Sequence, residues 1–315
     1  MTRIRVRPGF AVCATLILFS TCALYSQQTP QGNGMPVHMI VTVEPRHGSD
    51  VPSVSREDVM VYEGKERDQV TDWTPAQGDR AGLEVFILID DFSSPALSTQ
   101  LSSIKEFINA QPAGTKIGVA YMQNGIARVE QNLTTDHDLA VKSLRQPLGI
   151  GGSNASSYFS LTDLIKRWPE TASRREVLMI TSGIDLFYGV GDIEDPYLAT
   201  AIKDSQSAGI VVSAIYTPGP GHFGHSYWLN YWGQIYLSQL AEETGGEAYY
   251  IGFTGTAPDF TPYLKDATLR MAHQYLLTFL AKPEKKSGMR SVKLRTELPN
   301  VDLVSANAVY VPASE

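Results

Sequence analysis

Cysteine is nearly absent from this sequence. The two that occur, Cys13 and Cys22, lie within the first 24 residues, so the rest of the chain has neither a thiol nor a disulfide. A disulfide scaffold, a cysteine nucleophile and a cysteine-based zinc site are therefore excluded beyond that segment. Stability must come from a hydrophobic core, which a chain of 315 residues with 43% hydrophobic content is large enough to bury.

The chain also has fewer positively charged than negatively charged residues. The 26 Lys and Arg residues are outnumbered by 33 Asp and Glu residues, which gives a formal net charge of −7. Three of the positive charges, Arg3, Arg5 and Arg7, belong to the N-terminal segment, and without them the charge is about −10. Such a surface disfavours nucleic acid and anionic lipid as partners.

The first 26 residues have the order of a secretory signal peptide. The basic start precedes an uncharged apolar stretch at 11–24, and the small residues Ala23 and Ser26 offer cleavage points. The stretch is too short to span a membrane comfortably. We therefore expect an exported protein, periplasmic or extracellular, whose mature chain has no transmembrane span. Retention as an uncleaved N-terminal anchor is the alternative.

Three regions differ in their hydrophobic pattern. Short alternating stretches predict an N-terminal β flank over 37–78, and strand patterns return in a C-terminal β flank over 274–312. From 80 to 273, apolar strands alternate with helical segments. The expected central strands are 83–89, 116–122, 174–181, 210–216 and 247–251. This alternation predicts an α/β fold with a doubly wound, mainly parallel sheet, joined to a small β subdomain that both flanks form.

Oxygen-bearing side chains stand where this fold binds ligands, beyond the carboxyl ends of the strands. Asp90 ends the apolar run 83–89, Ser94 lies one turn further on, and Ser153 lies in a Gly-rich stretch. A carboxylate and hydroxyls are ligands of the kind that Mg²⁺ prefers. The expected metal ligands are thus Asp90, Ser94 and Ser153, with Asp91 as a further carboxylate.

At these positions the chain resembles the von Willebrand factor A (vWA) domain family. The metal-ion-dependent adhesion site of that family follows a D-x-S-x-S pattern, with a Thr in a Gly-rich loop and an Asp in a T-D-G turn. Asp90 and Ser94 match the first and last positions of the pattern, and Ser153 takes the place of the loop Thr. Two positions depart from it: Phe92 replaces the middle Ser, and Ser182 stands where the second Asp is expected.

The resemblance extends over residues 37 to 312. The stretch VSREDVMVYEGKERDQVTDW at 54–73 is similar to the segment before the A domain in the VWFA-related acidobacterial family of exported proteins. Residues 237–250 resemble the late helix and final strand of an A domain, and 275–296 resemble the β-rich close of that family. The resemblance implies a bacterial module for protein binding or adhesion.

The missing acid and hydroxyl leave two interpretations of the Asp90 region. In the first, a degenerate adhesion site binds Mg²⁺, with Asp91 or Asp185 compensating and an acidic side chain of the partner completing the shell, as the resemblance implies. In the second, the site is vestigial, and Ser93 or Ser94 caps the helix that follows.

Two further motifs fit catalysis or metal binding poorly. The stretch 151–155 is similar to the G-x-S-x-G of a nucleophile elbow, but the late histidine, His273, lies in a helix pattern opposite the expected site. His222 and His225 are three residues apart, and neither a Cys nor a nearby acid completes a zinc site. We expect a protein that is not an enzyme.

Aromatic residues gather in an expected loop at 217–234. Exposed Trp and Tyr side chains are good contact residues for proteins and for sugars. The expected partner contacts are Phe223, Tyr227, Trp228, Tyr231 and Trp232. A long loop that packs its own aromatic rings over the domain is the alternative.

The sequence therefore predicts an exported, non-enzymatic, vWA-like module for protein binding or adhesion, with a degenerate metal site. A metal-independent structural or assembly component of the cell envelope is the second hypothesis.

Overall fold

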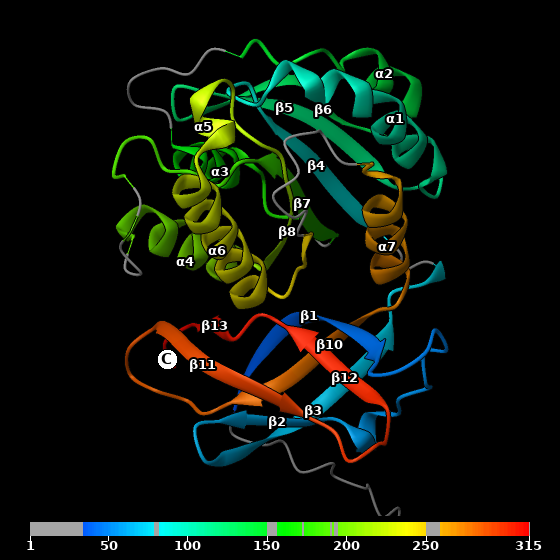
Figure 1. The fold of residues 1–315 in the computed structure, drawn as a ribbon. Coiled ribbons are helices and arrows are strands. Elements are labelled where there is room, and N and C mark those ends of the chain that lie inside the picture. The colour runs from blue at the N-terminus through cyan, green and yellow to red at the C-terminus, as the bar shows by residue number, and fades with distance from the viewer. Residues whose placement is uncertain are drawn as a thin grey trace, which may run out of the picture. The chain divides into compact units, whose positions relative to one another are not determined.

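The computed structural model describes residues 34–78, 82–149, 156–171, 173–189, 191, 195–249 and 259–314. The chain divides into a first unit, Met1–Gly32, and a second unit, Asn33–Glu315. The expected signal peptide, Ser153 and the Gly-rich stretch around it lie outside the described residues. The fold below is that of the second unit (Figure 1).

The central sheet has six strands in the order β6-β5-β4-β7-β8-β9. Their bounds are Leu83–Asp90 (β4), Lys116–Gln123 (β5), Ile126–Thr134 (β6), Arg174–Thr181 (β7), Ile210–Tyr216 (β8) and Ala248–Tyr249 (β9). All neighbours pair in parallel except β5 and β6, which are antiparallel. Strands β4 and β8 are buried along their whole length, which explains their nearly continuous apolar runs.

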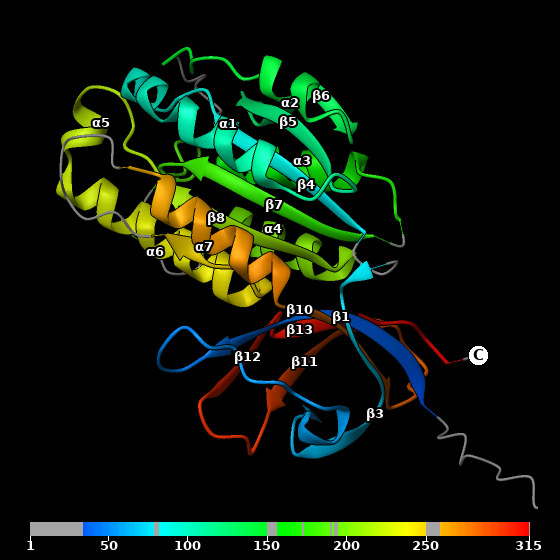
Figure 2. The same cartoon turned by 90° about the vertical axis from the view of Figure 1, so that its right-hand side faces the viewer.

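Helices cover both faces of this sheet. The α-helices are Leu101–Ala110 (α1), His137–Lys142 (α2), Ser157–Arg167 (α3), Pro196–Ala208 (α4), His222–His225 (α5), Tyr227–Thr244 (α6) and Thr261–Ala272 (α7). Helix α1 contacts α2 and α7, whereas α4 contacts α3 and α6. Figure 2 shows α1 and α7 in front of the sheet and α3 and α4 behind it. None of the helices in the described part of the chain is long and apolar enough to cross a membrane.

A second sheet is built from both flanks of the central region. Its seven strands lie in the order β12-β1-β10-β3-β2-β11-β13. They are Met35–Pro45 (β1), Met60–Glu63 (β2), Glu66–Pro75 (β3), Gln274–Ala281 (β10), Gly288–Arg295 (β11), Val301–Ser305 (β12) and Ala308–Val311 (β13). Every pairing is antiparallel, and β10 lies between β1 and β3. The α/β class is therefore confirmed, with one mixed sheet and one antiparallel sheet.

Strand β6 was missing from the sequence-based expectation. It follows a two-residue hairpin turn in which Asn124 and Gly125 both have positive φ, at 52° and 77°. An Asn-Gly pair is the preferred sequence for such a turn, so the signal was present. The strand itself lies at the edge of the sheet, where exposed and polar residues weaken its hydrophobic pattern.

The prediction of a loop at 217–234 is wrong over most of that segment, which is helical. Its first part leads into α5, and α6 begins at Tyr227, where the hydroxyl of Ser226 accepts a hydrogen bond from the Leu229 amide at 3.3 Å. The segment 301–311 holds two strands, and a 3₁₀ turn, Pro95–Gln100 (η3), precedes α1. A shorter 3₁₀ turn, Arg56–Asp58 (η1), precedes β2.

Two glycines let α6 lie directly against the segment that follows β7. A Cβ on Gly233 would lie 2.1 Å from the carbonyl oxygen of Ser182, and one on Gly183 would lie 2.3 Å from that of Gly233. Gly183 also has a φ of +67°, which disfavours any side chain. This close approach fixes the position of α6 at the carboxyl edge of the central sheet.

We expect Gly233→Ala to lower the free energy of unfolding by about 1–3 kcal/mol, because the added methyl group must push α6 away from Ser182. Urea unfolding of the whole chain measures the effect. Gly114→Ala is the matched control, since a Cβ there meets no atom within 4 Å. Equal stability of the two variants would contradict the close approach.

Candidate functional site

Two carboxylates stand at the tip of β4, where the parallel strands end. Asp90 is the last residue of the strand and Asp91 follows it, and their exposed fractions are 8% and 2%. Buried carboxylates are costly unless other groups hydrogen-bond to them or pair with their charge. The partners of these two side chains therefore decide what the site can bind.

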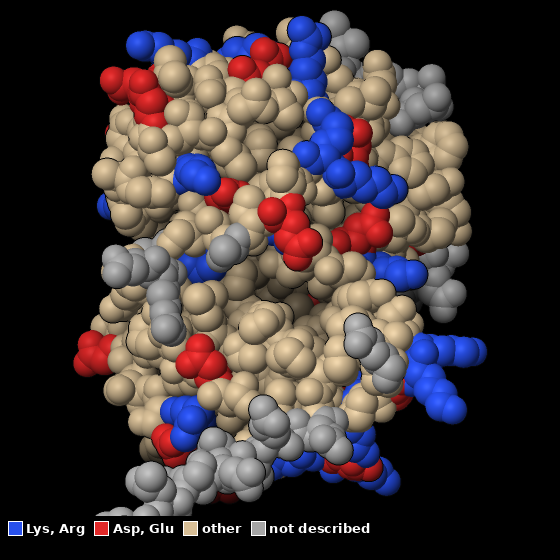
Figure 3. All heavy atoms as spheres, turned by 180° about the vertical axis from the view of Figure 1, so that it is seen from behind, with Lys and Arg blue, Asp and Glu red and all other residues tan. Residues whose placement is uncertain are grey.

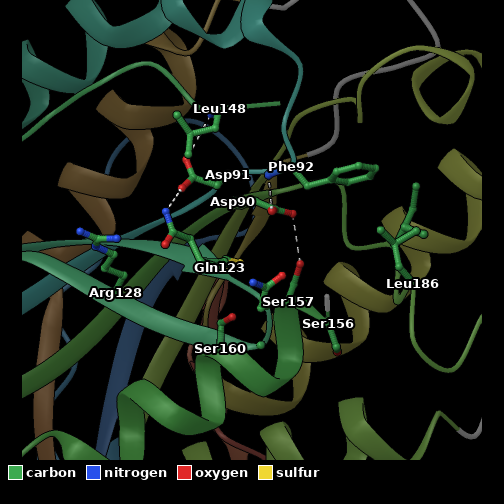
Figure 4. A pocket seen from close by; sticks show the side chains of 14 residues that line it. Asp90, Asp91, Phe92, Gln123, Arg128, Leu148, Ser156, Ser157, Ser160 and Leu186 are labelled. Atoms are coloured by element: carbon green, nitrogen blue, oxygen red, sulfur yellow. Dashed lines mark hydrogen bonds between the residues drawn. The ribbon is translucent and has the colours of Figure 1, made fainter. Parts of the chain in front are cut away.

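Protein donors surround the Asp90 carboxylate. Its Oδ1 accepts a hydrogen bond from the Phe92 amide at 2.9 Å, and its Oδ2 accepts one from the Ser157 hydroxyl at 3.3 Å (Figure 4). The same Oδ2 also accepts a hydrogen bond from the Thr181 hydroxyl at 2.7 Å. Burial raises the pKa of Asp90, and the hydrogen bonds from Thr181, Phe92 and Ser157 act in the opposite direction. The side chain thus ties β4 to the end of β7 and to the start of α3.

Asp91 is neutralised by a guanidinium group of the same chain. Arg145 Nη1 and Nη2 lie 2.6 and 2.7 Å from the two Asp91 oxygens, and the ring of Tyr121 lies 3.7 Å from the guanidinium carbon. The Gln123 amide donates to Asp91 Oδ2 at 2.5 Å, and the Leu148 amide donates to Oδ1 at 3.3 Å. A bidentate pair of this kind is strong, and it leaves Asp91 without a free lone pair directed into the crevice.

The remaining expected ligands are not brought together. Ser94 is half-buried and its hydroxyl accepts the Ala96 amide at 3.3 Å, so it caps the 3₁₀ turn η3. Ser153 lies outside the described residues.

Phe92, at the position of the absent serine, packs edge-on against Phe223 with ring centroids 5.2 Å apart. Asp185 accepts the Ser156 hydroxyl at 2.7 Å and the amides of its own turn.

A cavity of about 400 Å³ opens beside these side chains. Its lining comes from the end of β4, the β5–β6 hairpin, the start of α3 and the segment after β7 (Figure 4). Among the residues around it, Gln123, Arg128 and Ser160 provide polar groups, whereas Leu148 and Leu186 provide apolar ones. The crevice expected at the carboxyl edge is thus present.

The described residues do not fit Mg²⁺. That ion requires near-octahedral oxygen ligands, usually one or two carboxylates. Both carboxylates at the strand tip are already held by hydrogen bonds or by Arg145. No group of three or more His, Cys, Asp or Glu side chains able to hold a metal occurs within the described ranges.

Comparison with known proteins gives likeness only among solved structures, since no family model and no curated protein matches. One similar structure is that of an aerotolerance-related membrane protein from Bacteroides fragilis NCTC 9343 with multiple mutations to serines. Its sequence is 18% identical to this one, and the TM-score is 0.45. The match covers 60% of this chain and 98% of that chain. BatB from Bacteroides thetaiotaomicron is 16% identical with a TM-score of 0.46, over 61% and 98%. The SpRpn10 VWA domain is 14% identical with a TM-score of 0.38, over 59% and 94%.

The six-stranded sheet with helices on both faces has the α/β arrangement that the resemblance to the vWA family implied, and we call this part of the chain the vWA-like domain. At these identities and TM-scores the likeness is one of fold alone. What the vWA-like domain binds has to be argued from its own side chains.

The expected contact residues lie on two helices of the vWA-like domain. Phe223 is on α5 and half-buried, and the other four are on α6. The exposed fractions of Tyr227, Trp228 and Tyr231 are 65%, 56% and 41%, whereas Trp232 is half-buried between Tyr231 and Tyr236. We call Tyr227, Trp228 and Tyr231 the α6 aromatic face.

Sequence reasoning missed two further exposed aromatic residues. Phe187 and Tyr188, in the segment after β7, are exposed to 48% and 45%, and both rings pack against Tyr197 of α4. A Cβ on Gly191, in the same segment, would lie 3.4 Å from the Trp228 ring. Two adjacent aromatic residues in the segment that follows a strand were the signal that could have identified them.

The other two motifs remain without a complete site among the described residues. His222 and His225 are exposed on α5 and belong to no metal-binding group there. His273 follows α7, and Arg174 at the start of β7 donates to Met271, two residues before it. His273 therefore lies at the end of the sheet opposite Asp90.

We expect Arg145→Met to lower the free energy of unfolding by about 2–4 kcal/mol, because it leaves the Asp91 carboxylate buried without its counter-ion. Chemical denaturation of the whole chain measures the loss. The matched control is Arg128→Met, whose side chain is 64% exposed and lies 3.4 Å from Glu130, so that the expected loss is only about 0–1 kcal/mol. Similar losses in both variants would show that the Asp91–Arg145 pair has no special role.

Proposed function

We propose that this chain is an exported, non-enzymatic protein-binding module that holds its partner without a metal ion. The signal-like order of residues 1–26 supports export. The donors that surround Asp90 and Asp91 support binding without a metal, because a cation would have to displace Arg145 or the hydroxyls of Thr181 and Ser157.

The α6 aromatic face is the observation that carries this proposal. Three large aromatic side chains are exposed along one helix, and soluble proteins usually leave such groups exposed singly. Burying roughly 100 Å² of one ring gives about 2.5 kcal/mol of hydrophobic transfer free energy, which offsets part of the entropy cost of association. Tyr and Trp are also the residue types that most often dominate protein interfaces.

The opposite side of the molecule shows no surface of one charge sign among its described residues that would compete with the α6 aromatic face as the partner contact. Figure 3 shows the face turned away from the view of Figure 1, where the described Lys and Arg side chains are interspersed with Asp and Glu among uncharged residues. One-sign fields are what steer charged partners to a surface. The aromatic face is therefore the better candidate for the contact.

A structural or assembly component of the cell envelope is the second candidate. It is favoured by buried polar contacts that join the vWA-like domain to the flank sheet. Arg174 of β7 donates to the side-chain oxygen of Gln274 of β10, and the Gln274 amide donates to Glu176 of β7 at 2.6 Å. A fixed connection of this kind suits a component that holds its neighbours in place.

Site-specific photo-cross-linking tests the proposed function. We expect a benzophenone side chain at position 227 of the full chain, in the cells that produce it, to give one dominant protein adduct. The adduct should fall several-fold on Trp228→Ala, because that change removes a neighbouring contact ring, and it should persist in EDTA. Mass spectrometry of the adduct is the measurement.

Leu269 on α7 provides the matched control position, because it is 57% exposed but lies on another helix. A benzophenone there should give no such adduct. The same adducts from both positions would refute the α6 contact, and loss of the adduct in EDTA would refute metal independence.

A further inference from the structure

A groove continues from the α6 aromatic face toward the end of the helix. It has a volume of about 450 Å³, and its floor and walls come from α6 and from Asn307, in the turn between β12 and β13. Tyr231 belongs both to this groove and to the aromatic face. Figure 1 shows α6 running from α5 toward the strands of the flank sheet. We call this feature the α6 groove.

One buried side chain in the groove lacks hydrogen-bond partners. Gln234 is 3% exposed, and within the described chain neither its amide nitrogen nor its amide oxygen has a hydrogen-bond partner. Buried amide groups are nearly always paired, so such a residue calls for an explanation. It lines the groove three residues after Tyr231, on the same side of the helix.

The chemistry of that amide matches a peptide backbone. A glutamine side chain offers one donor group and one acceptor group, and a peptide unit in an extended chain offers the complementary carbonyl and N–H. Binding by an extended segment would therefore satisfy both Gln234 atoms at once. A lone apolar or anionic ligand would satisfy at most one of them.

Acidic side chains stand at the far end of the α6 groove. Glu242 and Glu243 both line it, and neither forms an ion pair with another side chain in the described ranges. Gln239 donates to Glu243 Oε1 at 2.9 Å, which holds one carboxylate in place. Two neighbouring carboxylates favour a basic side chain on the ligand.

The length of the surface sets the length of the ligand. From Tyr227 to Glu242 the helix rises about 22 Å at 1.5 Å per residue. An extended peptide rises about 3.3 Å per residue, so about seven residues cover that distance. The rings of Tyr227 and Tyr231 lie nearly parallel, with centroids 6.3 Å apart, and both side chains are exposed, so they offer apolar surface to such a segment.

We infer that the α6 groove binds an extended segment of about seven residues from the partner protein, with apolar side chains on the tyrosines and a basic side chain at Glu242 and Glu243. Gln234 pairs with the backbone of that segment. This inference rests on the proposed function, since it specifies how the same helix recognises its protein partner.

A phage-displayed library of random heptapeptides, selected on the whole protein, is the probe. We expect the enriched peptides to combine Lys or Arg with apolar residues. The best of them, labelled with fluorescein, should lose at least tenfold in affinity for Gln234→Leu and several-fold for Glu242→Gln in an anisotropy titration. Glu106→Gln on α1, an exposed acid outside the groove, is the matched control and should bind like the wild type.

Stability separates a binding effect from misfolding. Gln234→Leu removes a buried amide without hydrogen bonds, so its midpoint of unfolding should equal or exceed that of the wild type. Unchanged peptide affinity in Gln234→Leu would show that water satisfies the amide and would overturn the inference. Enrichment of acidic or uncharged peptides would overturn it as well.

Different experimental outcomes would contradict the proposed protein-binding function and the extended-peptide binding mode. A dominant adduct from position 227 together with no effect of Gln234→Leu would leave the protein-binding function standing and remove the extended-peptide mode. Absence of that adduct would remove both.

Discussion

The ion pair between Asp91 and Arg145 is the constraint on which the carboxyl edge of the central sheet depends. A carboxylate that is only 2% exposed requires a counter-charge, and Arg145 supplies it from a segment 54 residues further along the chain. The pair holds the residues after α2 against the tip of β4, and the Leu148 amide adds to the same carboxylate. The positive charge beside Asp91 is thus supplied by a side chain of the same chain.

The function proposed here places the partner contact on α6 and not at the strand tips. Phe92, two residues after the end of β4, packs against Phe223 of α5. Gly183 and Gly233 then hold α6 close to the end of β7. The exposed rings and the groove below them lie on this firmly supported helix, which favours a surface that is organised before the partner arrives.

The sequence predicted the parts that depend on local pattern. The run before Asp90 indicated a buried strand and its tip, and the hydroxyl of Ser94 was rightly considered as a cap. Arg145 could not be paired with Asp91, because no spacing rule links residues so far apart. The start of α6 was missed because its aromatic residues lie on several sides of the helix and obscure the 3.6-residue period. The isolated amide of Gln234 depends on tertiary packing alone.

Calorimetric titration of the whole, EDTA-treated protein with Mg²⁺ tests the central claim most directly. If Arg145 and the hydroxyl donors have replaced the ion, the heats up to about 10 mM should equal those of dilution, and Asp90→Ala should behave in the same way. Saturable binding in that range, abolished by Asp90→Ala, would contradict the account.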